Sequence, residues 1–428
     1  MHILILRFIF KLLTCSLPLI FQITSLGQVK KYNLLDSVIL SNSYTLKLDK
    51  ESLTGNAVPF LLKEIENTQF VILGEEHNIA EIPLFTEKLF MLIHDKFGFN
   101  YFATEQDPVM IEKISMKPYR GNLDSINKLA VRYLKGFTFI SDEELEMLAG
   151  IGKKSTAKYK PIWGCEQAFG VTHILDELKK NAKTKEQHNA IRLFQVESFE
   201  KERERDLARH HYMAEAGKKG KIDSLKKAFL SSNNKRTDYL IEAIEMSDSI
   251  YSLFKKSEQG DPGERYYNNL VREQYMKKLF SWNYNAAYAK EKKAPKVLFK
   301  YGQLHLYKGL NPLNILSLGN FISEFANSSG TSSFSIYMQV HRDTSSKAAI
   351  KDFANLAFLL PFANLSATNN WTLIDLRPLR PFYRIGALND LIDKNQILNF
   401  RTLIFGYDCL LLFGNGKRAT FSIANVPY

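Results

Sequence analysis

Several short motifs that would assign a function directly are missing from this chain. Its 428 residues contain no Gly-x-Ser-x-Gly, so a serine nucleophile elbow is not supported. No His-x-x-x-His and no cysteine pair marks a structural zinc site. No repeat of fixed period and no low-complexity segment stands out, and the composition does not suggest disorder or a fibre.

Cysteine is scarce, with three residues in the whole chain: Cys15, Cys165 and Cys409. Cys15 lies in a segment that we expect to be removed. The other two could pair in an oxidising compartment, but sequence cannot place their Cα atoms. A free thiol at Cys165 is the alternative, because Cys165 lies beside a candidate site.

Acidic residues are absent before Asp36. Arg7 and Lys11 supply positive charge, and an apolar stretch follows over residues 12–23. Small residues then lead to Gly27, which predicts a signal peptide over 1–27, cleaved before residue 28. The chain is therefore expected to be periplasmic or secreted, with no stable membrane span after cleavage. A membrane anchor and lipidation at Cys15 are the alternatives.

Positive charge exceeds negative charge, and cleavage of the signal would lower the formal net charge from +12 to +10 by removing Arg7 and Lys11. The lysines gather in stretches that are typical of solvated helix faces and loops. Residues 148–155 resemble a DNA-binding helix-hairpin-helix, but too few residues follow for its second helix. We therefore expect no nucleic acid partner.

Hydrophobic residues make up 45% of the chain, which is enough for a sizeable packed core. The length of the chain allows two or three domains. From residue 69 the pattern is strand, helix, strand: Phe70–Leu73, Pro83–Phe97 and Tyr101–Thr104. Such a unit predicts parallel, buried strands. Further strands are expected at Ile162–Gly164, Val297–Tyr301, Phe334–Val340, Thr372–Leu376, Leu403–Phe405 and Cys409–Phe413.

Residues 28–65 are expected to be a polar lead-in with one or two short helices. From residue 110 to 293 the chain is mostly helical and highly charged. The predicted fold is an α/β core with a central mixed, mostly parallel sheet flanked by helices. Residues 28–109 and 294–428 form that core. Residues 110–293 are an inserted helical subdomain over the carboxyl ends of the strands.

Four of the predicted strands run into titratable residues, and ligands of open α/β sheets bind outside the carboxyl ends of the strands. If the four strands are parallel neighbours, these residues converge. Carboxylates around two imidazoles suit general acid–base work on water, or a divalent metal that the sequence does not identify. The converging residues are Glu75, Glu76, His77, Glu105, Glu166 and His305. The remaining histidines, His173 among them, are expected at the solvated surface.

The same residues resemble motifs of the erythromycin esterase-like family. The matches keep their order over residues 69–420. They are Leu73-Gly74-Glu75-Glu76-His77 with Glu81, Glu105 after Gly98-Phe99, Arg272-Glu273-Gln274-Tyr275-Met276, the strand from Val297 to His305, and Phe405-Gly406-Tyr407-Asp408-Cys409-Leu410.

Two departures separate the chain from the family's esterases. The esterases usually place two residues between the first glutamate and the histidine of this motif. In this chain only Glu76 separates Glu75 from His77. This spacing is similar to that of the related haem- and iron-uptake (ChaN-like) lipoproteins. The esterases also tend to carry a second histidine where this chain has Gly302. Both departures weaken the case for a macrolide ester as substrate.

The resemblance implies a hydrolase that uses water to cleave an ester or amide of a small molecule, with no required cofactor. His77 is then the general base, and Glu75 and Glu105 orient or polarise it. His305 assists as a second acid–base or oxyanion partner. The expected substrate contacts are Glu76, Glu81, Glu166, Arg272 and Glu273. Arg272 and Glu273 come from the helical subdomain and could instead support the site residues, or form a structural ion pair.

Two alternatives remain open at this point. One is a non-catalytic protein that binds haem, iron or another metal ligand in the same cleft. The weaker one is a metal-dependent protease. The substrate and the oligomeric state do not follow from the sequence.

Overall fold

A computed structural model describes residues 32–48, 51–202, 213, 218–260, 262–366 and 370–423. The predicted signal peptide and its cleavage site lie outside these residues. Residues 34–428 form one unit, built around a nine-stranded sheet with the strand order β2-β1-β8-β9-β7-β3-β6-β4-β5. The boundaries expected at 109/110 and 293/294 stay predictions. No helix in the described ranges is long and apolar enough to cross a membrane.

The sheet is mixed, with its parallel strands in one block. The six neighbours from β9 to β5 are all parallel, and β8, β1 and β2 continue the sheet in antiparallel fashion. This confirms the predicted fold class. The parallel block contains β9 (Cys409–Gly416), β7 (Ser333–Asp343), β3 (Phe70–Glu75), β6 (Val297–Gly302), β4 (Tyr101–Thr104) and β5 (Ile162–Gly164).

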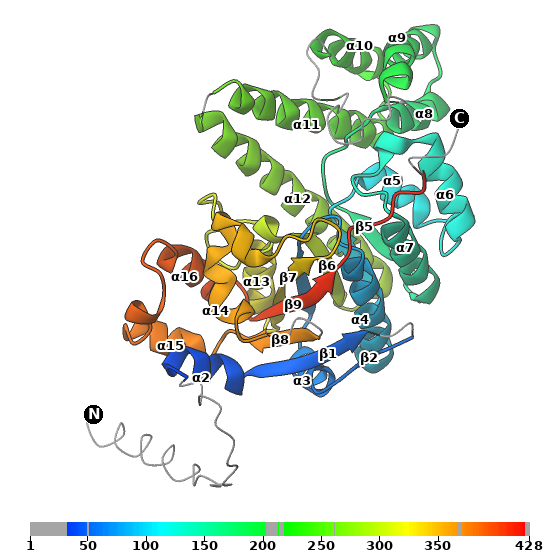
Figure 1. Cartoon of the computed structure of the whole chain (residues 1–428). Helices are drawn as coiled ribbons and strands as arrows, with labels where there is room; N and C mark the ends of the chain where they lie inside the picture. Colours follow the sequence, from blue (N-terminus) through cyan, green and yellow to red (C-terminus); the bar gives the residue numbers. More distant parts are fainter. Residues whose placement is uncertain are drawn as a thin grey trace, which may run out of the picture. The chain divides into compact units, whose positions relative to one another are not determined.

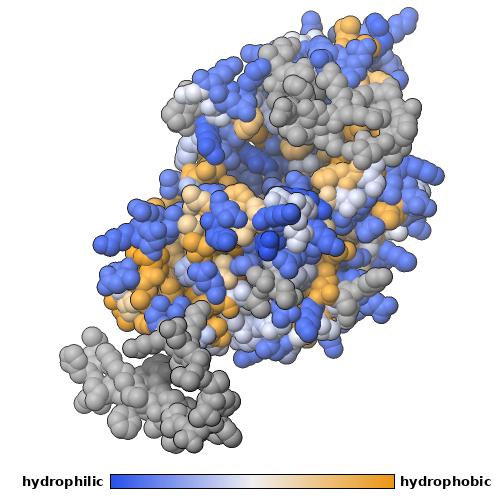
Figure 2. All heavy atoms as spheres, in the orientation of Figure 1, coloured by the Kyte–Doolittle hydropathy of each residue, from blue (hydrophilic) through white to orange (hydrophobic). Residues whose placement is uncertain are grey.

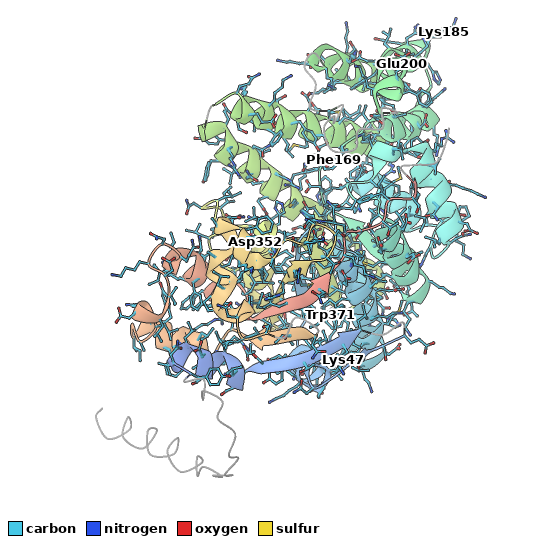
Figure 3. The ribbon with its side chains drawn as sticks, in the orientation of Figure 1. Lys47, Phe169, Lys185, Glu200, Asp352 and Trp371 are labelled. Carbon is cyan, nitrogen blue, oxygen red and sulfur yellow. The ribbon has the colours of Figure 1, made fainter. Side chains whose placement is uncertain are left out.

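The antiparallel edge combines one strand that the sequence predicted, β8, with two that it did not, β1 and β2. It contains β1 (Ser43–Leu48), β2 (Leu53–Thr54) and β8 (Trp371–Asp375). Figure 3 labels Lys47 on β1 and Trp371 on the adjacent β8, where Leu46 pairs with Trp371. The polar lead-in thus contains a strand pair between its two helices, α2 (Leu34–Ser41) and α3 (Ala57–Ile65). These strands escaped notice because they are short and only partly buried.

Alternate residues of β3 pack into different cores. Phe70 and Ile72 belong to one hydrophobic cluster, and Val71 and Leu73 to the other. This is the two-residue period of a strand buried on both faces. The long helix α12 (Pro262–Glu291) packs into the first cluster through Phe280. Helices α4 (Glu81–Phe97) and α7 (Asp142–Lys154) pack into the second.

Helix α4 begins and ends close to where the sequence predicted. Pro83 lies in its first turn, and the helix ends at Gly98, whose φ of 73° is the left-handed conformation that glycine adopts most easily. Residues 150–152, which resembled a helix-hairpin-helix turn, lie inside the continuous helix α7. The expected strand at Leu403–Phe405 is wrong. These residues lie in α16 (Ile397–Gly406), since a three-residue apolar run does not distinguish strand from helix.

The helical part of the chain has a hydrophobic cluster of its own, drawn mainly from four helices. They are α8 (Thr172–Asn181), α9 (Lys185–Glu202), α10 (Lys219–Phe229) and α11 (Lys235–Glu258), which lie together in Figure 1. Hydrophilic residues dominate the visible surface of these helices, whereas hydrophobic residues gather over α15 (Leu379–Arg384) and α16 (Figure 2).

Cys165 and Cys409 are both free and buried. They follow β5 and begin β9, at opposite ends of the parallel block. With about 4.8 Å between neighbouring strands, they are roughly 20 Å or more apart, far beyond disulfide reach. Burial raises the pKa of the Cys165 thiol to about 12, so it is not a reactive thiolate at neutral pH.

Candidate active site

Four adjacent parallel strands deliver their carboxyl ends to one place. In the order β3, β6, β4 and β5, they end at or before Glu75, Gly302, Glu105 and Glu166. A short 3₁₀ turn, Gln303–His305, follows β6. The four strands are therefore parallel neighbours, which is the condition under which the sequence analysis expected their end residues to converge. We refer to the resulting group of side chains as the strand-end cluster. It comprises Glu75, His77, Glu105, Glu166, Arg272, Glu273, Lys300 and His305.

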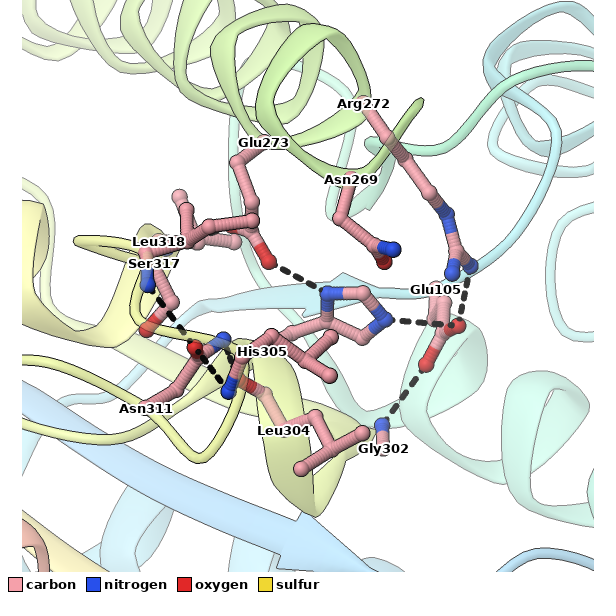
Figure 4. Close-up of polar contacts among 12 residues, drawn as sticks. Glu105, Asn269, Arg272, Glu273, Gly302, Leu304, His305, Asn311, Ser317 and Leu318 are labelled. Carbon is pink, nitrogen blue, oxygen red and sulfur yellow. Dashed lines mark hydrogen bonds and ion pairs between the residues drawn. The ribbon is translucent and has the colours of Figure 1, made fainter. Parts of the chain in front are cut away.

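Glu105 is the centre of the strand-end cluster and is buried. One of its oxygens, Oε2, accepts a hydrogen bond from the backbone N–H of Gly302 at 2.6 Å. The other, Oε1, accepts one from Arg272 at 2.6 Å. The Nε2 atoms of two imidazoles approach the same carboxylate: His77 at 4.0 Å and His305 at 3.6 Å. Figure 4 shows Glu105 between Arg272, His305 and Gly302.

His77 is the cluster member that solvent reaches most easily, with 39% of its side chain exposed. Its Nδ1 lies 3.3 Å from Oε1 of Glu75. Because an ionised carboxylate only accepts hydrogen bonds, Nδ1 carries the proton, and Nε2 of the neutral ring is free to accept one. The ring packs on Phe139, with centroids 4.7 Å apart. Gln106 holds the backbone around Phe139 through both of its amide atoms.

A side chain at residue 302 would crowd His77 in its present position. A Cβ atom at residue 302 would lie 2.8 Å from Nε2 of His77 and 3.2 Å from Oε2 of Glu105. The first contact is closer than real Cβ atoms show, and the second would require Glu105 to shift by a few tenths of an ångström. The ring of His77 and a side chain at residue 302 would thus compete for the same space.

Lys300 was missed by the sequence analysis, although a lone lysine inside an apolar strand was a usable signal. It is almost completely buried, and its Nζ donates to both oxygens of Glu75 at 2.8 Å each. The same Nζ lies 3.0 Å from Glu144, which enters from the first turn of α7. A lysine bonded on two sides fixes the Glu75 carboxylate, and Glu75 in turn orients His77.

His305 forms a second carboxylate–imidazole pair, and only 8% of its side chain is exposed. Its Nδ1 donates to Oε1 of Glu273 at 2.5 Å. The other oxygen of Glu273 accepts the backbone N–H of Leu318 at 2.7 Å, at the start of α13 (Leu318–Ser328). Glu273 comes from α12, so the helical part of the chain supplies half of this pair (Figure 4).

Arg272 joins Glu105 to the fully buried Glu166. Its Nε lies 3.0 Å from both oxygens of Glu166, and its Nη2 donates to Glu166 as well as to Glu105. Glu166 also accepts the backbone N–H of Gln167 at 2.7 Å. Arg272 and Glu273 are neighbours on α12 and hold Glu105 and His305 respectively. The Arg-Glu motif of the sequence therefore lies in the strand-end cluster.

Two predicted substrate contacts lie outside the strand-end cluster. Glu76 accepts hydrogen bonds from the Gln339 side chain at 2.5 Å and from the Val340 N–H at 3.1 Å, both on β7. Consecutive residues at a strand end point in opposite directions, which sends Glu76 away from His77. Glu81 lies in the first turn of α4 and accepts the backbone N–H of Lys417 at 3.0 Å.

The surface position expected for His173 is wrong. It is buried in α8, and its Nε2 lies 3.0 Å from Asp107, which caps the N-terminus of α5 (Pro108–Ile114). The helical pattern around His173 shows one apolar face, but which neighbour covers that face is decided by tertiary packing.

The charges and the burial in the strand-end cluster shift the pKa values of its carboxyl groups in different directions. Burial raises the pKa of Glu105, but His305, His77 and Arg272 outweigh burial and hold it at about 2. Glu75 is similar: burial raises its pKa, and Lys300 and His77 bring it below the usual value. Burial raises the pKa of Glu166, and Arg272 offsets only part of that effect.

Both imidazoles have a raised pKa. Burial lowers the pKa of His77, but Glu75 and Glu105 more than reverse this. For His305, burial and Arg272 lower the pKa, and Glu273 and Glu105 raise it above the usual value. Groups with perturbed pKa values at the carboxyl edge of a sheet are typical of sites that transfer protons.

Three atoms of the strand-end cluster have the spacing of metal ligands. One ligand atom each of Glu105, Glu166 and His305 lies within 4.8 Å of the others. Two carboxylates and an imidazole suit several transition metals. However, the guanidinium of Arg272 donates to both carboxylates and supplies the positive charge that an ion would bring. The residues do not fit a metal ion while Arg272 keeps these bonds.

The fold and the strand-end cluster define an α/β protein with a cluster of carboxylates and imidazoles at the ends of its parallel strands. No family model and no curated protein matches the chain. Among solved structures, a succinoglycan biosynthesis protein is similar at 15% identity, with a TM-score of 0.55. The match covers 93% of this chain and all of that one.

A variant of erythromycin esterase EreC in its open conformation is similar at 12% identity, with a TM-score of 0.54. The match covers 88% of this chain and 98% of that one. These likenesses confirm the fold that the motif resemblance implied. A haem-bound ChaN of Campylobacter jejuni also matches, at 12% identity over 69% of this chain and 91% of that one. Its TM-score is 0.30, too low to carry an argument.

Proposed function

We propose that this protein hydrolyses an ester bond of a small molecule, with His77 as the general base that activates water. The observation that carries the proposal is the arrangement of His77. Its ring is exposed to solvent on one side, while Nδ1 is held by Glu75 and Nε2 faces Glu105. An imidazole oriented by a carboxylate, with its second nitrogen accessible, is the usual form of a general base.

The distance between two side-chain atoms supports this role for His77. Nε2 of His77 and Oε2 of Glu105 are 4.0 Å apart, so one water molecule can lie at a hydrogen-bond distance of about 2.8 Å from both. His77 takes one proton of this water through Nε2 as the water oxygen bonds to the ester carbonyl carbon. The tetrahedral oxyanion then collapses, the C–O bond to the alcohol breaks, and the protonated His77 returns the proton to the leaving oxygen.

The oxyanion needs positive charge or hydrogen-bond donors close to the reacting carbon. His305 is the candidate for this role, because its raised pKa favours the imidazolium form and Glu273 fixes its ring. Arg272 keeps Glu105 and Glu166 in place and adds positive charge to the same wall. Glu105 itself stays ionised, since its pKa is about 2.

A panel of p-nitrophenyl and small-molecule esters, assayed with the full chain and with His77→Ala, tests the proposal. His188→Ala is the matched control, because His188 is an exposed histidine of α9 far from the strand-end cluster in sequence. We expect the His77 variant to lose hydrolysis while retaining the wild-type circular dichroism spectrum. Equal activity of wild type and His77→Ala on every ester that is cleaved would sink the proposal.

A metal-binding protein is the second candidate, favoured by the spacing of Glu105, Glu166 and His305. Calorimetry with Mn²⁺ and Zn²⁺ separates it from the hydrolase. If a metal is resident, it has to displace Arg272, so Arg272→Ala should bind the ion more tightly than wild type. Absorbance titration tests haem, and chelator added during peptide cleavage tests a metal-dependent protease. The proposed location remains periplasmic or secreted, as the N-terminal sequence predicts.

A further inference from the structure

A cavity of about 740 Å³ lies in the helical part of the chain. Its walls come from α5, α6 (Leu123–Arg132), α8 and α11, together with the loop between α5 and α6. No member of the strand-end cluster lines it. Figure 1 shows α5, α6 and α8 gathered in one region. The volume falls within the range of small-molecule sites, so this cavity requires an account separate from the strand-end cluster.

Basic side chains dominate the cavity, with six cations against two carboxylates. The two carboxylates are already engaged. Asp176 accepts hydrogen bonds from Gln195 at 2.5 Å, from Arg132 at 3.3 Å and from the Tyr133 hydroxyl. Glu177 lies 2.7 Å from Lys113 and 2.8 Å from Lys180. The six cations are Lys113, Lys117, Lys128, Arg132, Lys180 and Arg236.

Two of the cations have no carboxylate partner. Within the described ranges of the chain, no acidic group lies within 4.0 Å of Lys117 or Lys128. Arg236 instead reaches Glu112 outside the cavity lining, at 2.9 Å. Lysine side chains on a convex surface can move apart into solvent, whereas Lys117 and Lys128 line the same cavity. A bound anion would relieve their mutual repulsion there, because a concave basic wall concentrates anions.

The cavity wall is not purely basic. Val109, Met116 and Leu129 contribute apolar surface. The ring of Tyr133 lies between two cations, with Lys113 Nζ 5.3 Å and Arg132 Cζ 5.0 Å from its centroid. These contacts hold two of the cationic side chains against the wall, which lowers the entropy lost when they bind a ligand.

We propose that this cavity is a binding site for a small, multiply charged oxyanion ligand that carries phosphate or carboxylate groups. Ammonium and guanidinium groups pair with either through charge-assisted hydrogen bonds. Several lysines act as point charges and suit a compact anion with more than one negative group. The site is independent of ester hydrolysis by the strand-end cluster.

Calorimetric titration of the full chain with inorganic tripolyphosphate, and separately with citrate, tests this site at low ionic strength. We expect binding of at least one probe, and the stronger one identifies the preferred group. Lys117→Glu combined with Lys128→Glu should weaken that binding by about tenfold or more. Lys227→Glu combined with Lys290→Glu is the matched control, because it removes two exposed lysines outside the cavity and changes the net charge equally.

Three results decide the matter. Loss confined to the cavity variant, with ester hydrolysis unchanged, supports the site. Absence of binding to both probes overturns it, and so does an equal loss in the two double variants, because that shows a general charge effect. If the glutamate variant does not fold by circular dichroism, Lys117→Gln combined with Lys128→Gln replaces it, with a smaller expected loss in the same direction.

Discussion

The two carboxylate–imidazole pairs that flank Glu105 are alike in chemistry and different in setting. The Glu75–His77 pair has a 3.3 Å contact and a ring with 39% of its surface exposed. The Glu273–His305 pair has a 2.5 Å contact and a ring with 8% exposed. The pair after β3 is thus open to solvent, whereas the pair after β6 is buried and includes Glu273 of α12. In the proposed mechanism the exposed His77 is the base, and the enclosed His305, held by Glu273, is the oxyanion partner.

Replacing each histidine is the strongest way to break this comparison. His77→Ala should reduce kcat/KM by about 10³-fold, or roughly 4 kcal/mol, with little loss of stability. His305→Asn should cost about 10²-fold, as for loss of an oxyanion donor. It should also lower the free energy of unfolding, because the buried Glu273 loses its partner. Kinetics and urea unfolding on both variants measure the difference, and identical behaviour would show that burial does not separate the roles.

The next largest effect is expected from Lys300, which supports only the Glu75–His77 pair. Lys300→Met leaves Glu75 and Glu144 buried without their cation, at a cost of about 3 kcal/mol in the free energy of unfolding. That cost should shrink at low pH, where the two carboxyl groups take up protons. Lys293→Met, at an exposed lysine just before β6, is the control. An unchanged urea midpoint in Lys300→Met would contradict the buried ion pairing.

A smaller effect is expected from Gly302, whose backbone lies against His77 and Glu105. A methyl group there meets Nε2 of His77 at 2.8 Å, so Gly302→Ala should move the ring and cost about tenfold in kcat/KM, in line with the sensitivity of catalysis to misplacement. Gly220→Ala is the control, because nothing lies within 4 Å of its added Cβ. Full activity in Gly302→Ala would mean that the position of His77 is not critical.

The smallest expected effect is a shift in the pH dependence of kcat/KM. Burial lowers the pKa of His77, but Glu75 and Glu105 raise it above the usual value. The base is the neutral ring, so kcat/KM should rise with pH, with its midpoint above the ordinary imidazole value of about 6.5. Glu105→Gln removes one of the raising charges and should move the midpoint to lower pH. A midpoint that does not move would assign the titration to another group.

Much of the strand-end cluster followed from sequence, because parallel strands carry their own chemistry to one edge. Glu75, His77, Glu105, Glu166 and His305 were expected together on that ground, and the structure brings them together. Arg272 and Glu273 were expected to contact the substrate or the residues that hold it, and they lie inside the cluster as partners of Glu105 and His305. Glu76 and Glu81 could not be separated from the others, since a motif does not show on which side of a strand end a residue points.

The sequence by itself determined the strands of the parallel block, the βαβ start and the titratable residues at the strand ends, because these depend on local periodicity. Only the tertiary structure decided which strands are neighbours, that Lys300 and Glu144 hold Glu75, and that Arg272 lies where a metal would bind. Contacts between residues more than a hundred positions apart have no local signal. The same reason applies to Gly302, because only the tertiary structure shows that the ring of His77 lies against its backbone.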